Sequence, residues 1–458
     1  TSLIGDMIDQ YSDTTLTGKL NVYFHADYSR LINSKKIFNG SISISNFGPS
    51  ENLLSDSKLY VNRFHDVGSA GPWNQFIRRN IKAIISDFGI YRKFKNSSST
   101  YGLQYETVIG FIGTNLSGLG FRSRITGMNM LDVNAHPYFK YEMKTGKDSY
   151  LFETYAGVSE KKGDSFNYFD ITYSASLQFV KKTGKHHSLK WKLLMDRQLP
   201  NSFYFHPDSL LTGSGIMING AKDIFPLNNY YISIGINGMD LFKQRSWNVV
   251  AYAGNKRGEY KNSTKQYDGL IIWDFFESNT INLGSSANGD FFIPELKIKT
   301  SGSLSITKSI SAFVANDKRG FTKMYHRRYA LGIASGFKFP LNVEMKEVYD
   351  ISTLSWNENV LGKVVQMETY FGLKINPMQQ LFLSALYFQK YFRDSGTFHG
   401  LDFYAVFSLN SKLSFSLKGH NLLIYRFFKS INSDILGVSI TDTKLVGRYL
   451  LFAIDWVL

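Results

Sequence analysis

The residues of this sequence that could carry out chemistry are histidines beside hydroxyl or carboxyl groups. His186, His187 and Ser188 are consecutive, and on a strand His186 and Ser188 would share a face, where a base could activate a nucleophile. Aspartate–histidine combinations that could serve hydrolysis are His65-Asp66, His206 with Asp208, and His399 with Asp402. Because such pairs also arise by chance in polar loops, we predict no catalytic residue and expect that the protein is not an enzyme.

Metal and cofactor chemistry has little support in the sequence. The chain has no Cys, which excludes disulfide scaffolds, Cys-ligated zinc, iron–sulfur clusters and Cys nucleophiles. A P-loop, a Rossmann glycine fingerprint, an HExxH motif and an EF-hand loop are also absent from the sequence. We therefore predict no cofactor and no metal site.

The elements that must position these residues are strands, because apolar and polar residues alternate with a period of two along most of the chain. In 20–28 the even positions are Leu20, Val22, Phe24, Ala26 and Tyr28, with polar residues between most of them. The same split recurs in 169–179, 189–196, 230–237, 361–375 and 401–410. Many of the predicted strands run for about 12–16 residues, which is long for a soluble sheet but suits a tilted strand that crosses a bilayer.

Composition favours a membrane-spanning sheet over membrane-spanning helices. Aromatic residues make up 16% of the chain, and no uninterrupted apolar run approaches the length of a membrane helix. Aromatic residues at the ends of the apolar faces, where a girdle would meet lipid headgroups, are Trp191, Tyr230, Tyr329, Phe339, Tyr349 and Phe371. Strands cross lipid only if every edge is paired, so we predict an all-β fold, a large antiparallel transmembrane β-barrel of about 20–22 strands. A soluble sandwich or propeller is the alternative.

The connections between the predicted strands come in two sizes. Short turns are predicted at 145–148, 183–185, 339–340, 376–377 and 410–412. Long polar connections are predicted at 48–79, 198–226, 255–268, 279–290 and 426–443. This arrangement is typical of short periplasmic turns and long extracellular loops, in a barrel whose lumen is too wide for its own side chains to fill.

The net charge of +15 comes from basic residues spread over strands and loops, such as Lys190, Lys192, Lys297, Lys299, Lys412 and Lys418. The chain has no Arg-rich helix, so we expect no nucleic-acid partner. A mixed-charge lumen wall is predicted from Glu344, Glu347, Glu368, Lys363, Lys374, Lys412 and Lys418. The runs 181–182 and 326–328 are interpreted as rim charges that meet the phosphates of lipopolysaccharide or inner-leaflet lipid, with a dedicated ligand site as the alternative.

The strand at 413–419, the corner at 421–423 and the final strand at 448–458 together resemble the last segments of TonB-dependent outer-membrane receptors. The alternating strand 413–419 leads into a corner formed by Asn421, Leu422 and Leu423, and a long loop then precedes a final strand that begins with Arg448-Tyr449. The apolar face of that strand resembles the C-terminal signal read by the barrel-insertion machinery, and its residues are Leu450, Phe452, Ile454, Trp456 and Leu458. The resemblance covers 411–458, and it implies a C-terminal barrel without its plug domain: a lead-in segment over 1–13 and a barrel domain over 14–458.

The resemblance implies a location in the outer membrane of a Gram-negative bacterium and energy-coupled uptake of a nutrient. The partners it implies are outer-membrane lipid, lipopolysaccharide, the barrel-insertion machinery, and TonB acting through a plug not present in this chain. Two alternatives stay open: a plugless barrel that serves as a scaffold or accessory subunit for other outer-membrane proteins or surface lipoproteins, and a passive porin-like channel. A barrel hydrolase is a further, weaker alternative.

Overall fold

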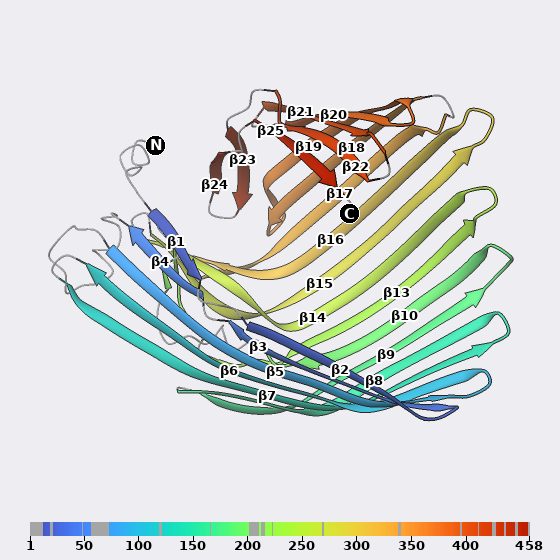
Figure 1. Cartoon of the computed structure of the whole chain (residues 1–458). Coiled ribbons are helices and arrows are strands. Elements are labelled where there is room, and N and C mark those ends of the chain that lie inside the picture. Colours follow the sequence, from blue (N-terminus) through green and yellow to red (C-terminus); the bar gives the residue numbers. More distant parts are fainter. Residues whose placement is uncertain are drawn as a thin grey trace.

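A single curved antiparallel sheet dominates the computed structural model (Figure 1). The structure describes residues 12–456 apart from 19–21, 48, 56–72, 119–120, 165, 201–209, 212–215, 222, 268–269, 338–339, 394–395, 411, 424–426, 435–436 and 445–447. No helix in this part of the chain is long and apolar enough to cross a membrane. The predicted fold class, all-β with one large antiparallel sheet of the barrel type, is confirmed.

The strands of the sheet follow one another in chain order, each paired antiparallel with the next. The first nine are β2 (Val22–Asn33), β3 (Lys36–Phe47), β5 (Trp73–Lys93), β6 (Ser97–Gly118), β7 (Phe121–Thr145), β8 (Asp148–Gly163), β9 (Asn167–Lys182), β10 (His187–Gln198) and β13 (Leu227–Asp240). The others are β14 (Arg245–Tyr267), β15 (Leu270–Ile293), β16 (Ile298–Ala315), β17 (Lys318–Ser335), β18 (Leu341–Trp356), β19 (Asn359–Met378), β20 (Leu381–Phe392), β21 (Gly396–Ser408), β22 (Leu413–His420) and β25 (Tyr449–Trp456).

Six shorter strands lie in the connections. β1 (Ser12–Gly18) pairs with β4 (Pro49–Ser55), which also pairs with β5. β11 (Leu210–Leu211) and β12 (Ile216–Ile218) lie between β10 and β13, and β12 runs parallel to β15. β23 (Phe427–Asp434) and β24 (Gly437–Lys444) form a separate hairpin before β25.

The number of strands is close to the expected 20–22. Nineteen antiparallel strands form the continuous sheet in the described part of the chain. The predicted boundary between 1–13 and 14–458 falls inside β1, which begins at Ser12, and residues 1–11 lie outside the described part of the chain. The division into two segments stays a prediction.

The sheet has two chemically different faces, which we call the apolar face and the polar face. Ile234 on β13 is opposite Trp191 and Ala251, while the next residue, Ser233, is opposite Lys192 and Tyr252. The apolar face is open to its surroundings: Ile234 is 54%, Ile333 54% and Leu331 71% exposed. Because exposing this much apolar surface to water is costly, the apolar face needs an apolar environment.

The two rims of the sheet differ, as predicted, but short turns also occur on the rim where only long loops were expected. The turns predicted at 145–148, 183–185 and 410–412 lie on one rim, which we call the turn rim. The turn predicted at 376–377 is on the same rim, but it begins two residues later than predicted, after Met378 at the end of β19. On the far rim, three long connections at 48–72, 199–226 and 421–448 occur together with a larger number of short connections. The described turns there include Asn316-Asp317 and Asn357-Glu358, whose residues all have positive φ, as a two-residue hairpin of type I′ requires.

Two predicted loops are wrong. Of the loops predicted at 255–268 and 279–290, residues 255–267 belong to β14 and residues 279–290 belong to β15. The two strands pair along nearly their whole length, with one irregularity between Lys256 and Glu259. Polar residues on both faces hide the alternation in sequence, yet the backbone still satisfies its hydrogen bonds by continuing the hairpin. The far rim is therefore built largely of extended hairpins: β7, with 25 residues, is about 80 Å long, whereas a tilted crossing needs only about 9–11 residues.

Candidate functional site: the polar face

The polar face carries small hydroxyl and amide side chains along its central strands. On β16, serine and threonine occupy every second position from Ser301 to Ser311. On β15 the opposite positions hold Asn282, Ser286 and Asn288, which face Ser309, Ser305 and Ser303. This face offers many hydrogen-bonding groups and little bulk, so it suits contact with water or a hydrophilic molecule.

Most charges on the polar face are paired across neighbouring strands. The N–O distances are 2.6 Å for Lys140–Glu153, 2.8 Å for Lys161–Asp132, 2.9 Å for Lys374–Glu344 and 2.9 Å for Lys390–Glu368. The first two pairs join β7 to β8, and the last two join β18 to β19 and β19 to β20. Alternation in the sequence predicts such a mixed-charge wall, and the strand register decides which residues pair.

A buried polar network joins β7, β8 and β9 towards the far rim. Lys161 and Asp132 keep only 8% and 13% of their side chains exposed, and nearby Ser159 and Thr172 are almost fully buried. His136 Nε2 lies 2.7 Å from Thr172 Oγ1, which lies 3.0 Å from Ser159 Oγ. Sequence reasoning missed this network because its members lie 13 to 36 residues apart. Its groups satisfy one another, so it holds three strands in register.

A groove that contains lysines but no carboxylates lies on the polar face of β10, β13, β14 and β15. Its volume is about 770 Å³, and Lys190 and Lys192 lie on one side of it. The polar residues that complete its lining are Asn229, Tyr231, Ser233, Asn237, Ser246, Asn248 and Asn288. No Asp or Glu lines it, and neither lysine forms an ion pair with another residue that the structure describes. The groove therefore suits an anionic, oxygen-rich ligand.

The histidines singled out from sequence do not form a catalytic site. His186 contacts the carbonyl of Met239 at 3.2 Å and lies 3.9 Å from Asp240, beside the turn that follows β13. Ser188 donates a hydrogen bond of 2.7 Å to Asn237 and belongs to the polar face. His187 points to the apolar face, where its ring packs against Trp247 at 5.7 Å.

The aspartate–histidine combinations are not brought together either. His399 is hydrogen-bonded to the hydroxyl of Tyr387 at 2.6 Å, whereas Asp402 pairs with His420 at 3.0 Å. His65, Asp66, His206 and Asp208 lie outside the described residues. Whether the protein is an enzyme therefore stays an untested expectation.

The predicted mixed-charge wall needs two corrections. Glu344, Glu368, Lys374 and Lys418 belong to the polar face, in agreement with the prediction. Glu347 and Lys363 instead belong to the apolar face, because Glu347 is opposite Leu331 and Lys363 is opposite Thr353. Because side chains alternate along a strand, the odd-numbered Glu347 shares a face with Met345 on β18, and Lys363 shares a face with Val365 on β19. The prediction considered the charge of these residues but not this alternation. Lys412 lies in the turn before β22.

The basic run 326–328 is divided between the two faces. His326 and Arg328 face the polar side, where His326 lies 3.2 Å from Asp350 and 3.0 Å from Ser352. Arg327 is opposite Ile306 and Ile351, so it belongs to the apolar face. The run 181–182 is divided in the same way, with Lys181 on the apolar face beside Leu189.

The C-terminal elements have the geometry that the resemblance implies. β25 pairs with β22, and Leu450, Phe452 and Ile454 alternate on the apolar face with Leu451 and Ala453 on the polar face. Leu458 lies outside the described residues. At the corner, Asn421 has a φ of 50°, its backbone N–H donates to Asp402, and that of Leu422 donates to the carbonyl of Leu401. The signal and corner roles stay predictions.

In the part of the chain that the structure covers, no group of three or more His, Asp and Glu side chains could hold a metal ion. No protein-family model and no curated protein matches the sequence.

Several solved structures align with most of this chain at very low sequence identity. The copper transporter OprC aligns with a TM-score of 0.49 and 9% identity, over 97% of this chain and 80% of that chain. The open form of the ferric-catecholate import receptor Fiu from E. coli K12 aligns with a TM-score of 0.46 and 8% identity, over 98% and 81%. The FrpB iron transporter from Neisseria meningitidis aligns with a TM-score of 0.46 and 10% identity, over 98% and 82%. The function proposed below rests on this chain's own residues.

Proposed function

We propose that this chain is a transmembrane β-barrel of a Gram-negative outer membrane and that it takes part in energy-coupled uptake of a hydrophilic nutrient. The observation that carries the proposal is the two-faced sheet: an exposed apolar face for lipid, and a polar face of hydroxyls, amides and paired charges for the lumen. Closed on itself at the usual tilt, a sheet of 19 strands would have a diameter of about 40 Å between backbones. Such a lumen requires a plug or conducts solutes.

The resemblance to TonB-dependent receptors favours a plug that TonB remodels. In this proposal the plug occupies the wide lumen, the extended far-rim hairpins receive the substrate, and movement of the plug opens a path along the polar face. The groove lined by Lys190 and Lys192 supports an anionic substrate with many oxygen atoms, because two lysines without ion-pair partners lie there among amide side chains.

The experiment that tests this proposal begins with the intact mass of the protein extracted from its native outer membrane. A mass well above 52.2 kDa, with a plug and a TonB-contacting segment in the extra sequence, supports the receptor. Uptake of an anionic solute into cells should then stop when TonB is removed and should weaken in a K190Q/K192Q variant. A mass near 52.2 kDa together with uptake independent of TonB would contradict energy coupling.

A passive channel is the second candidate, and the groove supports it too. Without a plug, a polar lumen with two unpaired lysines would conduct and would select anions. Planar-bilayer recordings separate the candidates: large, steady conductance with anion selectivity that falls in K190Q/K192Q supports the channel, and a closed barrel supports the plugged receptor.

A further inference from the structure

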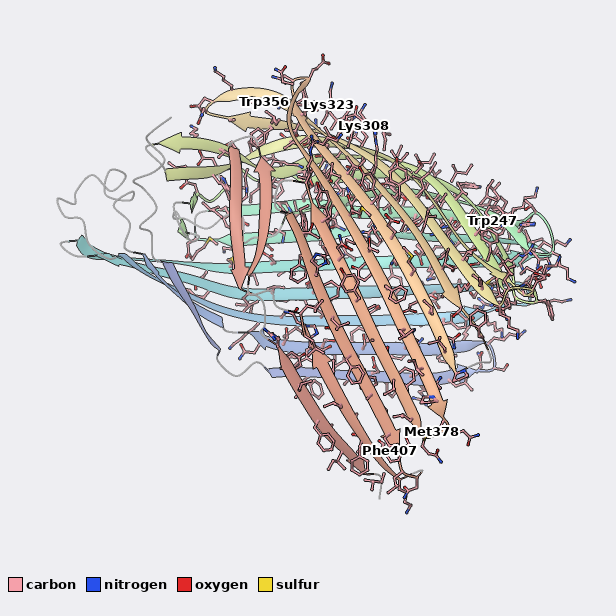
Figure 2. The ribbon with its side chains drawn as sticks, turned by 90° about the horizontal axis from the view of Figure 1, so that it is seen from above. Trp247, Lys308, Lys323, Trp356, Met378 and Phe407 are labelled. Carbon is pink, nitrogen blue, oxygen red and sulfur yellow. The ribbon has the colours of Figure 1, made fainter. Side chains whose placement is uncertain are left out.

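Three cavities on the polar face join into one continuous track. The first is the groove on β10, β13, β14 and β15, which lies nearest the turn rim; Trp247, near the start of β14, marks that end (Figure 2). The second, called the middle cavity, has a volume of about 470 Å³ and shares Lys192 and Leu194 with the groove. The third, called the far cavity, has a volume of about 660 Å³ and shares Gln104 and Tyr155 with the middle cavity.

The track is elongated. On β10 alone it extends from Lys190 in the groove to Gln198 in the far cavity, a distance along the strand of about 26 Å. It also crosses the sheet, from Asn288 on β15 to Ile81 on β5. A small ion would occupy only one of the three cavities, so the shape of the track favours a ligand that is itself a chain.

The far cavity combines polar groups with an apolar side that lies nearer the far rim. Its amides and one of its carboxylates belong to Gln104, Glu106, Asn134 and Gln198, and its apolar side is formed by Ile81, Ala83, Val108 and Met130. The side chains of Gln104 and Gln198 are exposed, so their amides are accessible to a ligand. Planar amides and carboxylates offer two hydrogen-bonding groups in one plane, which matches hydroxyls on neighbouring carbons of a sugar. The carbon-bound hydrogens of the same sugar suit the apolar side.

Two aromatic rings are held in place beside these amides. The rings of His136 and Tyr155 lie 4.9 Å apart. Gly157 on β8 leaves room for His136, because a Cβ there would meet the carbonyl of Ala135 and lie 2.7 Å from the imidazole ring. The imidazole therefore crosses β8 and reaches Thr172 on β9 at 2.7 Å. The Tyr155 hydroxyl donates a hydrogen bond of 2.9 Å to a carboxylate on β10. Rings fixed in this way offer a flat surface on which a sugar ring can stack.

The charge of the track changes from one end to the other. At the turn-rim end, Lys190 and Lys192 lie among amides with no carboxylate in the lining of the groove. In the far cavity Lys161 is neutralised by Asp132 at 2.8 Å, whereas Glu106 forms no ion pair with another residue that the structure describes. An anionic group therefore suits the lysine end, and a neutral part of the ligand suits the far cavity.

We propose that this track binds an oligosaccharide that carries an acidic group at one end. The acidic end lies at Lys190 and Lys192, and neutral sugar rings occupy the far cavity, where they stack on the His136 and Tyr155 rings. Between the two ends, hydroxyl groups line the middle cavity, on Thr100, Ser174 and Ser176. The inference rests on the proposed function, because it specifies the class of the anionic, oxygen-rich substrate.

The test measures binding to the folded protein in mild detergent by isothermal titration calorimetry. The probes are the aldonic acids of cellotetraose, maltotetraose and xylotetraose, each with one carboxylate at one end, and the neutral parent of each. Gluconate tests a single acidic unit, and tetraglutamate tests an acidic chain that is a peptide. We expect at least one of the three acids to bind about tenfold more tightly than its neutral parent and than gluconate.

Two variants separate the ends of the track. K190Q/K192Q should reduce the affinity for the acid to that for its neutral parent and leave the affinity for the parent unchanged. Q104L/Q198L should weaken the acid and the parent alike, by about tenfold, because both place sugar hydroxyls in the far cavity. The matched controls are K346Q/K418Q, on the polar face of β18 and β22, and N376L, an exposed amide of β19; all three positions lie outside the three cavities. Heat-modifiable migration on gels checks that each variant is folded.

The proposal is overturned if none of the three acids binds, or if gluconate binds as tightly as the best acid. Equal binding of tetraglutamate would replace the oligosaccharide by an acidic peptide. A loss of affinity as large in the controls as in the track variants would place binding elsewhere on the polar face. Binding in detergent requires neither TonB nor a plug, so its failure is distinguishable from a failure of energy-coupled uptake in cells.

Discussion

Charged residues on the polar face between β7 and β8 differ sharply from three basic residues on the apolar face of β16, β17 and β19, which are Lys308, Arg327 and Lys363. In the first region Lys161 pairs with Asp132 and Lys140 pairs with Glu153, each across the two neighbouring strands. In the second, three basic side chains share the apolar face and lack such partners among the described residues. Charges that neutralise one another contribute to the fold, whereas unpaired charges are suited to an external anion.

The largest effect is expected at the apolar face of the final strand. Replacing both Phe452 and Trp456 by Asp should abolish assembly in the membrane, because it destroys the predicted C-terminal signal and puts charge on the face that meets lipid. Heat-modifiable migration after outer-membrane extraction measures assembly. The control is Leu451→Asp, on the polar face of the same strand, which should still assemble. A normally assembled double variant would refute the role assigned to this strand.

The buried pair is the next most sensitive point. Asp132→Asn leaves Lys161 charged and buried, so we expect a loss of about 3–5 kcal/mol in the free energy of unfolding. Urea titration in detergent micelles measures it. Combining Asp132→Asn with Lys161→Met should restore most of the loss, because the unpaired charge is then gone. An unchanged urea midpoint in the single variant would show that the pair is not shielded from water.

Cysteine labelling tests the assignment of the two faces without perturbing either charged region. Val365 lies on the apolar face and Gln366, its neighbour on β19, lies on the polar face. In native membranes, Cys at Val365 should react only with lipid-soluble reagents, and Cys at Gln366 with water-soluble ones. The chain has no natural Cys, so no background substitution is needed. The reverse labelling pattern would mean that the register is shifted by one residue.

The smallest effect is expected at the exposed pair. Lys140 and Glu153 keep 47% and 42% of their side chains exposed, so Glu153→Gln should cost no more than about 1 kcal/mol in the same urea titration. The comparison with Asp132→Asn isolates burial, since both changes neutralise a carboxylate between β7 and β8. A loss as large as that of Asp132→Asn would mean that something shields Lys140 and Glu153 from solvent.

The sequence predicted the fold class and the faces wherever one strand face is consistently apolar. The even positions of 22–28 and the odd positions of 363–375 both lie on the apolar face, as alternation indicates. The predictions failed where polar residues occupy both faces, as in 255–268 and 279–290. They also failed for Glu347 and Lys363, which were assigned to the lumen wall because they are charged, although alternation along each strand puts them on the apolar face. The groove around Lys190 and Lys192 was missed because its residues come from four strands.

What the sequence by itself determined is the two-faced antiparallel sheet, because a period of two is a local property that each strand displays alone. Only the tertiary structure decided which charges neutralise one another, since pairing depends on register between strands far apart in the chain, as for Lys161 and Asp132. It also decided what the two faces of 326–328 contact, because neighbours exist only when strands are joined: His326 lies beside Asp350, whereas Arg327 is opposite Ile306 and Ile351. Charge is encoded residue by residue, but its neutralisation depends on neighbours.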